Sequence, residues 1–116
     1  MENKIEIVKS ITRETLREIA KNQFGDMVKA VVDVGRTLMA IGGELHADEE
    51  ALLLEDGSRQ ADLWGINVYP AKPSDDWIVF DSVINVRPSQ GNRSRGIEDT
   101  AVRARIMEVV GNIVQR

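Results

Sequence analysis

The chain has 116 residues, 42% of them hydrophobic and 29% charged, and a formal net charge of -4. This length fits one globular domain with a buried core and leaves no room for a second domain. The negative net charge argues against a dedicated nucleic-acid-binding protein, because such proteins usually carry a basic surplus. The charge is uneven: residues 44–62 hold seven acidic side chains and one arginine, whereas residues 87–105 hold five arginines and two acidic side chains.

The chain contains no cysteine, which excludes disulfides, cysteine nucleophiles and thiolate metal sites. This absence is typical of a reducing compartment, so we expect a cytoplasmic location. The first eight residues alternate charged and apolar side chains, unlike a signal peptide, and no apolar run approaches the length of a membrane span. We therefore expect no membrane partner.

The chain begins with a predicted strand and helix. Lys4–Lys9 favours a short strand. Thr12 can cap an amphipathic helix that runs to about Asn22, and Gly25 ends it.

A hairpin and a short helix follow. Met27–Val34 and Thr37–Glu44 are rich in β-forming residues and predict two antiparallel strands. Gly35 and Arg36 alone separate them, and a two-residue loop that begins with glycine favours a type II′ turn. The acidic residues 48–50 precede Ala51–Leu54, with a glycine soon after, which predicts a short helix.

The second half predicts another strand pair and a long helix. Asp62–Tyr69 and Trp77–Val86 read as strands around residues 70–76, whose two prolines oppose ladder pairing. The final helix runs from about Asp99 to Val114. Its apolar positions fall on one stripe at helical spacing, namely Val102, Ile106, Val109, Val110 and Ile113.

These elements predict an α+β fold for a single domain over residues 1–116. We expect a mainly antiparallel sheet of four or five strands, built from two hairpins. The N-terminal helix, the short middle helix and the long C-terminal helix should pack on one face of this sheet.

Alternation along the second strand pair predicts a polar face. In Trp77–Val86 the side chains of Ile78, Phe80, Ser82, Ile84 and Val86 should point towards the helices, and the others away. The residues expected on the opposite face include Asn67, Tyr69, Asp81, Asn85 and Arg87. This face could bind a ligand, or it could merely solvate the uncovered side of the sheet.

The segment Arg87–Gly96 carries three arginines and two glycines between a predicted strand and a predicted helix. Its glycines have the spacing of a phosphate-binding P-loop, but Ile97 and Glu98 stand where that motif needs lysine and a hydroxyl residue, so we do not expect a nucleoside triphosphatase. Backbone amides at the helix start, together with Arg93 and Arg95, could hold a phosphate or carboxylate. Alternatively, these arginines pair with acids of residues 44–62 or of a neighbouring subunit.

His46 is the only histidine. It could act as a general base oriented by Asp48 or Glu44, because its ordinary pKa lies near neutrality. Without a marked nucleophile it could equally be a helix cap or a hydrogen-bonded turn residue. One histidine without cysteine cannot supply the usual zinc ligands, so we expect no tightly bound metal and no cofactor.

Four segments together resemble a family of short prokaryotic proteins classed only as a domain of unknown function. These segments are Phe24–Asp33, Gly42–Glu50, Asp62–Asn67 and Arg87–Arg95. The resemblance spans nearly the whole chain and implies a single domain. It implies no activity, substrate or catalytic residue.

Three functions remain open. We favour a non-enzymatic anion- or nucleic-acid-binding module that uses the Arg87–Gly96 loop, with a phosphate-containing ligand or nucleic acid as partner. The first alternative is an interaction or homo-oligomerisation domain without a small ligand, such as a homodimer. The second is a small hydrolase or nuclease with His46 or Asp81 as base. The candidate ligand-binding residues are Arg87, Gln90, Asn92, Arg93, Arg95, Asn67, Tyr69, Asp81 and His46.

Overall fold

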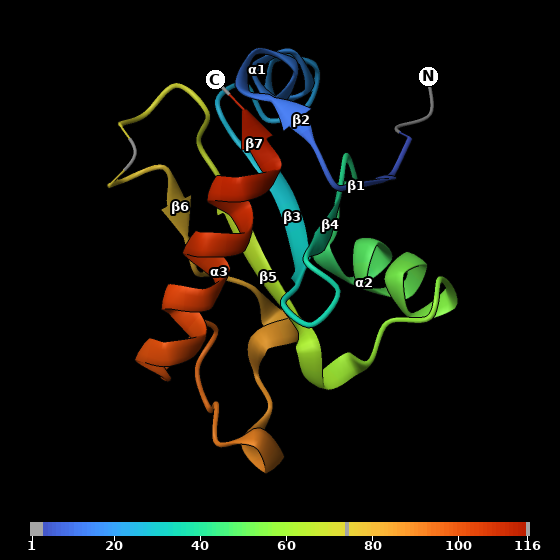
Figure 1. The fold of residues 1–116 in the computed structure, drawn as a ribbon, viewed down its shortest axis with the longest axis vertical. Helices are drawn as coiled ribbons and strands as arrows, with labels where there is room; N and C mark the ends of the chain where they lie inside the picture. Colours follow the sequence, from blue (N-terminus) through green and yellow to red (C-terminus); the bar gives the residue numbers. More distant parts are fainter. Residues whose placement is uncertain (1–3, 74, 116) are drawn as a thin grey trace.

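The computed structural model describes residues 4–73 and 75–115 and confirms the α+β class. Five antiparallel strands form one sheet in the order β1-β4-β3-β5-β6 (Figure 1). The strands are β1 (Glu6–Val8), β3 (Val28–Asp33), β4 (Leu38–Ile41), β5 (Leu63–Val68) and β6 (Ile78–Val79). The α-helices of the described residues are α1 (Arg13–Asn22), α2 (His46–Glu55) and α3 (Thr100–Ile113).

The first and last helices form where the sequence predicts them. Thr12 caps α1 by accepting a hydrogen bond from the Thr15 amide, and Gly25 lies just beyond its end with a φ of 93°. In α3 the predicted apolar stripe faces the sheet, and Asp99 caps the helix by accepting from the Ala101 amide. A two-residue parallel pair, β2 (Ile11–Thr12) with β7 (Val114–Gln115), then joins the segments next to these helices.

The helices do not all pack on one face, contrary to the expectation. One core cluster joins α1 and α3 to alternate strand residues such as Ala30 and Met39. A second cluster joins Leu53 of α2 to the intervening residues, including Val31 and Ala40. Because β3 and β4 are apolar on both faces, helices on one face alone would leave the second set in water. The face that α2 covers is called the α2 face below.

The β3–β4 turn is not the predicted two-residue type II′ turn. Asp33 pairs with Leu38, so four residues form the loop, and the residue in the left-handed region is Thr37 (φ 57°) instead of Gly35. The buried Asp33 carboxylate accepts hydrogen bonds from the Gly35 and Arg36 amides. The geometry of this turn is therefore set by the Asp33 side chain, which folds back on the loop.

The predicted strand Trp77–Val86 pairs with the sheet through two residues, Ile78 and Val79, and then ends. The chain leaves the sheet after Val79 and forms short 3₁₀ turns at Val83–Asn85 and Pro88–Gln90. The Asn85 side chain then takes the strand's place, accepting from the Gly65 amide (2.8 Å) and donating to the Gly65 carbonyl (2.9 Å). The predicted alternation consequently fails, and Ile84 packs in the cluster on the α2 face.

Candidate functional site

Arg87, the first arginine of the predicted loop, is a buried structural residue with 8% of its surface exposed. Its guanidinium group donates to the carbonyl oxygens of Ile84 and Gln60, at 2.9 and 2.8 Å, and to that of Leu63. It also pairs with Glu50 at 3.4 Å. Every guanidinium nitrogen is thus engaged, and Arg87 ties α2 to the start of β5.

Asn92 and Glu98 close the remainder of the loop. The Asn92 side chain donates to three carbonyl oxygens, those of Asn85, Ser94 and Gly96, and accepts from the Glu98 amide. The Glu98 carboxylate accepts hydrogen bonds from the Arg93 and Ser94 amides, at 2.7 and 3.1 Å. The backbone amides considered for an external anion therefore already hold a carboxylate of the same chain.

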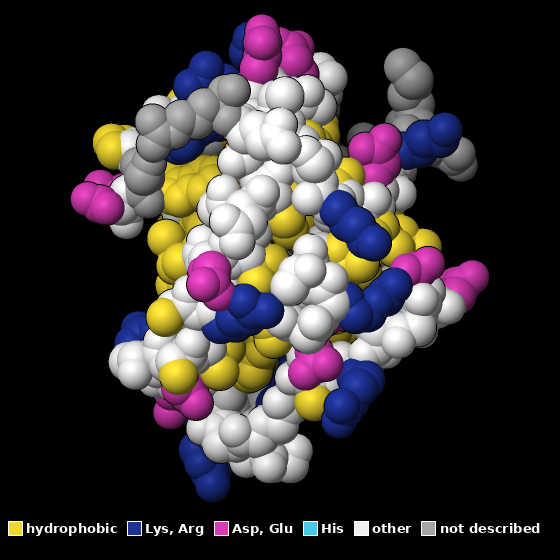
Figure 2. Space-filling model, viewed as in Figure 1, with side chains coloured by type: hydrophobic (Ala, Val, Ile, Leu, Met, Phe, Trp, Pro, Cys, Tyr) yellow, Lys and Arg dark blue, Asp and Glu magenta, His cyan; other side chains and the backbone are white. Residues whose placement is uncertain are grey.

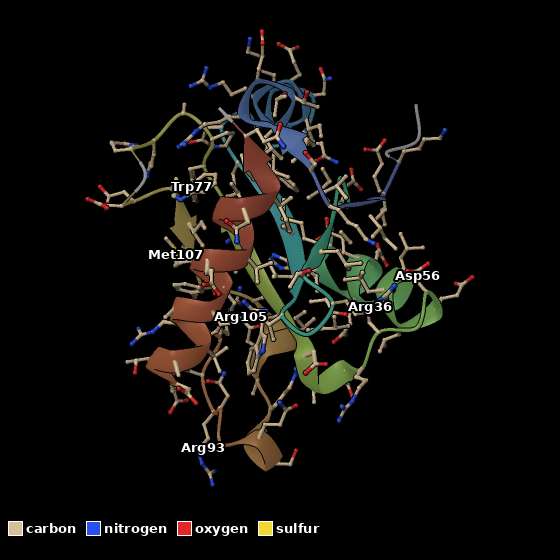
Figure 3. All side chains as sticks on the ribbon, in the orientation of Figure 1. Arg36, Asp56, Trp77, Arg93, Arg105 and Met107 are labelled. Atoms are coloured by element: carbon tan, nitrogen blue, oxygen red, sulfur yellow. The ribbon has the colours of Figure 1, made fainter. Side chains whose placement is uncertain are left out.

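Three further candidates, and Asn85 of the predicted polar face, have separate places. Arg93 points into solvent at the tip of the loop, away from the other labelled residues (Figure 3). Gln90 donates to the Ala61 carbonyl. Tyr69 lies under the Lys72 ammonium, 4.5 Å from the ring centroid. Asn85, expected on the polar face, is buried in the sheet edge as described above.

The remaining candidates gather on the α2 face. Lys29, Asn67 and Val79 are neighbours in register across β3, β5 and β6. The Asn67 amide nitrogen lies 3.5 Å from the Asp81 carbonyl, and the Asp81 carboxylate holds Arg95 Nε at 2.8 Å. The His46 imidazole lies beside this row, because its Nε2 is 2.8 Å from the carbonyl oxygen of Ile66. These six residues (Lys29, His46, Asn67, Val79, Asp81 and Arg95) are called the His46 face.

The hydrogen bond of His46 fixes its tautomer. A carbonyl oxygen only accepts, so Nε2 carries the proton and donates it. Burial lowers the pKa of His46, the charges of Lys29 and Arg95 lower it further, and the Ile66 carbonyl and Asp81 oppose this shift. The neutral ring leaves Nδ1 as a lone-pair acceptor that has no hydrogen-bond partner in the described part of the chain.

Arg95 is held on the His46 face from two sides. Its carbonyl oxygen accepts from the Ser82 amide and from the Asn85 side chain, both at 3.0 Å, which fixes the main chain. Its Nε pairs with Asp81, whereas neither terminal amino group has a hydrogen-bond partner among residues 4–73 and 75–115. The guanidinium group is thus oriented, with two donors left over.

Glu49, one helical turn after His46, is fully buried. Burial raises the pKa of its carboxyl group to about 9, although the Gly43 amide and the charge of Lys29 lower it. One carboxyl oxygen accepts from the Gly43 amide at 2.9 Å, and the other has no hydrogen-bond partner among the residues that the structure describes. Glu49 is therefore a neutral acid at pH 7, which leaves Asp81 as the negative charge within the His46 face.

The family model described as "Protein of unknown function (DUF5674)" matches residues 5–113. The chain belongs to this family. The match confirms the resemblance to a domain of unknown function. No curated protein and no solved structure matches the chain.

Two residues of this DUF5674 chain were not predicted as site residues. Glu49 stands three residues after His46 and four before Leu53, so these residues share one side of the helix. An acid at such a buried position is the sequence signal that could have identified Glu49. Lys29 lies between the buried residues Val28 and Ala30 of a strand, which marks its side chain as belonging to the opposite face.

The described residues of the DUF5674 chain carry neither a membrane-spanning helix nor a cluster of metal ligands. In residues 4–73 and 75–115, no helix combines the length and the apolar character needed to cross a bilayer. Nor do three or more histidine or acidic side chains of these residues converge on a point that could hold a metal ion.

Proposed function

We propose that this protein binds a small ligand with a phosphate or carboxylate group on the His46 face. Asp81 orients the Arg95 guanidinium, and both terminal amino groups are without a partner among the described residues; this observation carries the proposal. Two such donors match the two oxygens of a carboxylate or phosphate. The proposal keeps the predicted anion but retains only Arg95 from the arginine-rich loop.

The other residues of the His46 face support an anionic ligand. Lys29 supplies a second cation, and its ammonium group lies 5.1 Å from the centroid of the Phe24 ring. Both cations are close enough to His46 to lower its pKa, so their fields overlap at the ring. The neutral Nδ1 can accept a hydrogen bond from a hydroxyl group of the ligand.

A small anion fits this face better than a nucleic acid. Two cations stand against Asp81, whereas nucleic-acid binding generally requires several phosphate contacts along a basic stripe. The net charge of -4 also opposes a polyanion. A cytoplasmic location, as predicted from the sequence, stays part of the proposal.

Titration with inorganic phosphate and with citrate, followed by amide shifts in NMR spectra, tests the proposal. We expect shifts at residues 44–46, 66–68 and 79–81. Arg95→Gln should weaken binding by about 10- to 100-fold, because a charge-assisted hydrogen bond contributes roughly 1.5–3 kcal/mol.

Arg93→Gln is the matched control, because Arg93 is exposed and lies two residues from Arg95 in sequence. The variant removes the same charge from a side chain outside the His46 face. We expect it to leave binding unchanged. Equal losses in Arg93→Gln and Arg95→Gln would assign the anion to the loop tip, and no shifts with either anion would refute the proposal. Tighter binding of a single-stranded oligonucleotide than of phosphate would favour the nucleic-acid alternative.

A hydrolase is the second candidate, favoured by one observation. Asp81 lies in contact with Arg95, and the Nδ1 of His46, which has no hydrogen-bond partner in the described part of the chain, lies within the electrostatic fields of both. A base and a charge-stabilising arginine require this proximity. Turnover of phenyl phosphate that is lost in His46→Gln would support this alternative. Binding without turnover would leave the binding module.

A further inference from the structure

A second candidate site lies beyond the C-terminal end of β5, between α1 and the loop from β5 to β6. A cavity of about 730 Å³ opens there, bounded by α1 on one side and by residues 70–73 on the other. Figure 2 shows dark-blue cationic side chains bordering a yellow apolar surface near this loop. The cavity shares no lining residue with the His46 face.

Arg13 links the two sides of the cavity. Its Nε donates to the Pro70 carbonyl at 2.6 Å, and its Nη2 donates to the Lys72 carbonyl at 2.5 Å. The guanidinium group also lies 4.4 Å from the centroid of the Trp77 ring. Since α1 and the loop are 57 residues apart in sequence at this bond, Arg13 fastens two distant segments together and sets the width of the cavity.

The cavity is strongly cationic. Arg17 follows Arg13 by one helical turn, lines the cavity and has no hydrogen-bond or ion-pair partner in the described part of the chain. Lys72 lines it from the loop, with its ammonium group over the Tyr69 ring. Glu14 is the acid among the described lining residues, so three cations oppose one carboxylate in this part of the chain.

The remaining lining is apolar. Pro70, Ala71 and Pro73 form the loop side. Proline removes backbone donors and restricts the backbone, so this wall offers contact area in a constrained conformation. A volume of several hundred Å³ is the usual size for a metabolite-sized ligand.

We propose that this cavity binds an organic anion: a carboxylate or phosphate group facing Arg17 and Lys72, attached to an aromatic or aliphatic body that packs on the prolines. Charge alone would fit inorganic phosphate equally well. The apolar wall is the reason to expect an organic body.

Phenyl phosphate is the probe, and the two tryptophans report on it. Trp77 lies beneath Arg13, which lines the cavity, whereas Trp64 lies beneath Arg87, which does not line it. The expected result is a saturable shift of the Trp77 indole N–H resonance while that of Trp64 stays in place. Neutral benzyl alcohol should bind at least tenfold more weakly.

Variants separate this site from the His46 face. Arg17→Gln/Lys72→Gln should weaken phenyl phosphate binding at Trp77 by tenfold or more. Arg59→Gln/Arg103→Gln, which removes the same charge from exposed positions, should not. The Trp77 shift should persist in Arg95→Gln. A failure of anion binding at the His46 face would therefore not count against ligand binding in the cavity.

Three results would overturn the inference. They are the absence of a Trp77 shift, unchanged affinity in Arg17→Gln/Lys72→Gln, and equal binding of benzyl alcohol and phenyl phosphate. The last result would mark an apolar cavity without preference for an anion.

Discussion

Glu49 shows how one buried carboxyl group makes stability depend on pH. Its pKa is raised from an ordinary 4.5 to about 9, so between these values the folded state holds a proton that the unfolded state releases. The stability that Glu49 contributes is fully present below pH 4.5 and is lost as the pH rises towards 9. At pH 7 this loss amounts to about 3 kcal/mol.

Glu49→Gln should abolish this pH dependence. Between pH 7 and 9, where His46 is mostly neutral in both states, the free energy of unfolding of the natural protein should fall by up to about 1.4 kcal/mol per pH unit. The glutamine carries no titrating proton, so its curve should be nearly flat. Urea unfolding followed by tryptophan fluorescence measures both slopes.

Glu55→Gln is the control, because it changes an exposed glutamate of the same helix. It should keep the slope of the natural protein. An undiminished slope in Glu49→Gln would show that Glu49 is ionised in the fold.

The arginines show what sequence can and cannot predict for single residues. The sequence identifies a cationic loop, but Arg87, Arg93 and Arg95 are equivalent in it. Their roles differ because Arg87 meets carbonyl oxygens from distant segments, Arg95 meets Asp81, and Arg93 meets solvent. These contacts depend on where the chain leaves the sheet, which local pattern does not specify.

Elements with strong periodicity were predicted well, and the broken strand was not. The C-terminal helix has a regular stripe and a capping aspartate, both of which are local signals. Residues 77–86 alternate well enough for a strand, yet Asn85 satisfies Gly65 through its side chain and so replaces the ladder. A side chain that makes the hydrogen bonds of a neighbouring strand leaves no periodic pattern in the sequence.

Two glycines should respond in opposite directions to alanine. At Gly65 a new methyl group would lie 2.6 Å from the Cβ and Oγ of Ser82, so Gly65→Ala should destabilise the fold by roughly 1–3 kcal/mol. At Gly111, within α3, no described atom lies within 4 Å of the new methyl group, so Gly111→Ala should stabilise the fold by about 1 kcal/mol. Thermal or urea unfolding measures both.

The two variants control for each other, since the chemical change is identical. A stable Gly65→Ala protein would mean that residues 82–85 are not packed on β5 as described. A destabilised Gly111→Ala protein would mean that this face of α3 is covered.

For the whole molecule, the placement of α2 could not be predicted. The sequence indicates that both faces of β3 and β4 are apolar only when both alternating sets of strand residues are considered. It does not indicate that α2 covers the second face, because Leu53 is a single buried apolar position in a short helix. The acidic and basic segments do meet, at Glu50 and Arg87. Their complementarity is therefore used at least partly within the fold.

The sheet edges bear on the interaction alternative. Both edge strands are short, Glu6–Val8 and Ile78–Val79, and short edges resist pairing with a second sheet. We therefore expect a monomer in sedimentation equilibrium at micromolar concentration. A stable dimer there would favour the oligomerisation domain instead.

The most direct test of the His46 face is a pH titration of the imidazole nitrogens by NMR, in which the single histidine gives one set of signals. We predict a neutral ring protonated at Nε2, a pKa below the ordinary 6.5, and a rise of that pKa when phosphate is added. A pKa at or above 6.5 that phosphate does not change would contradict it.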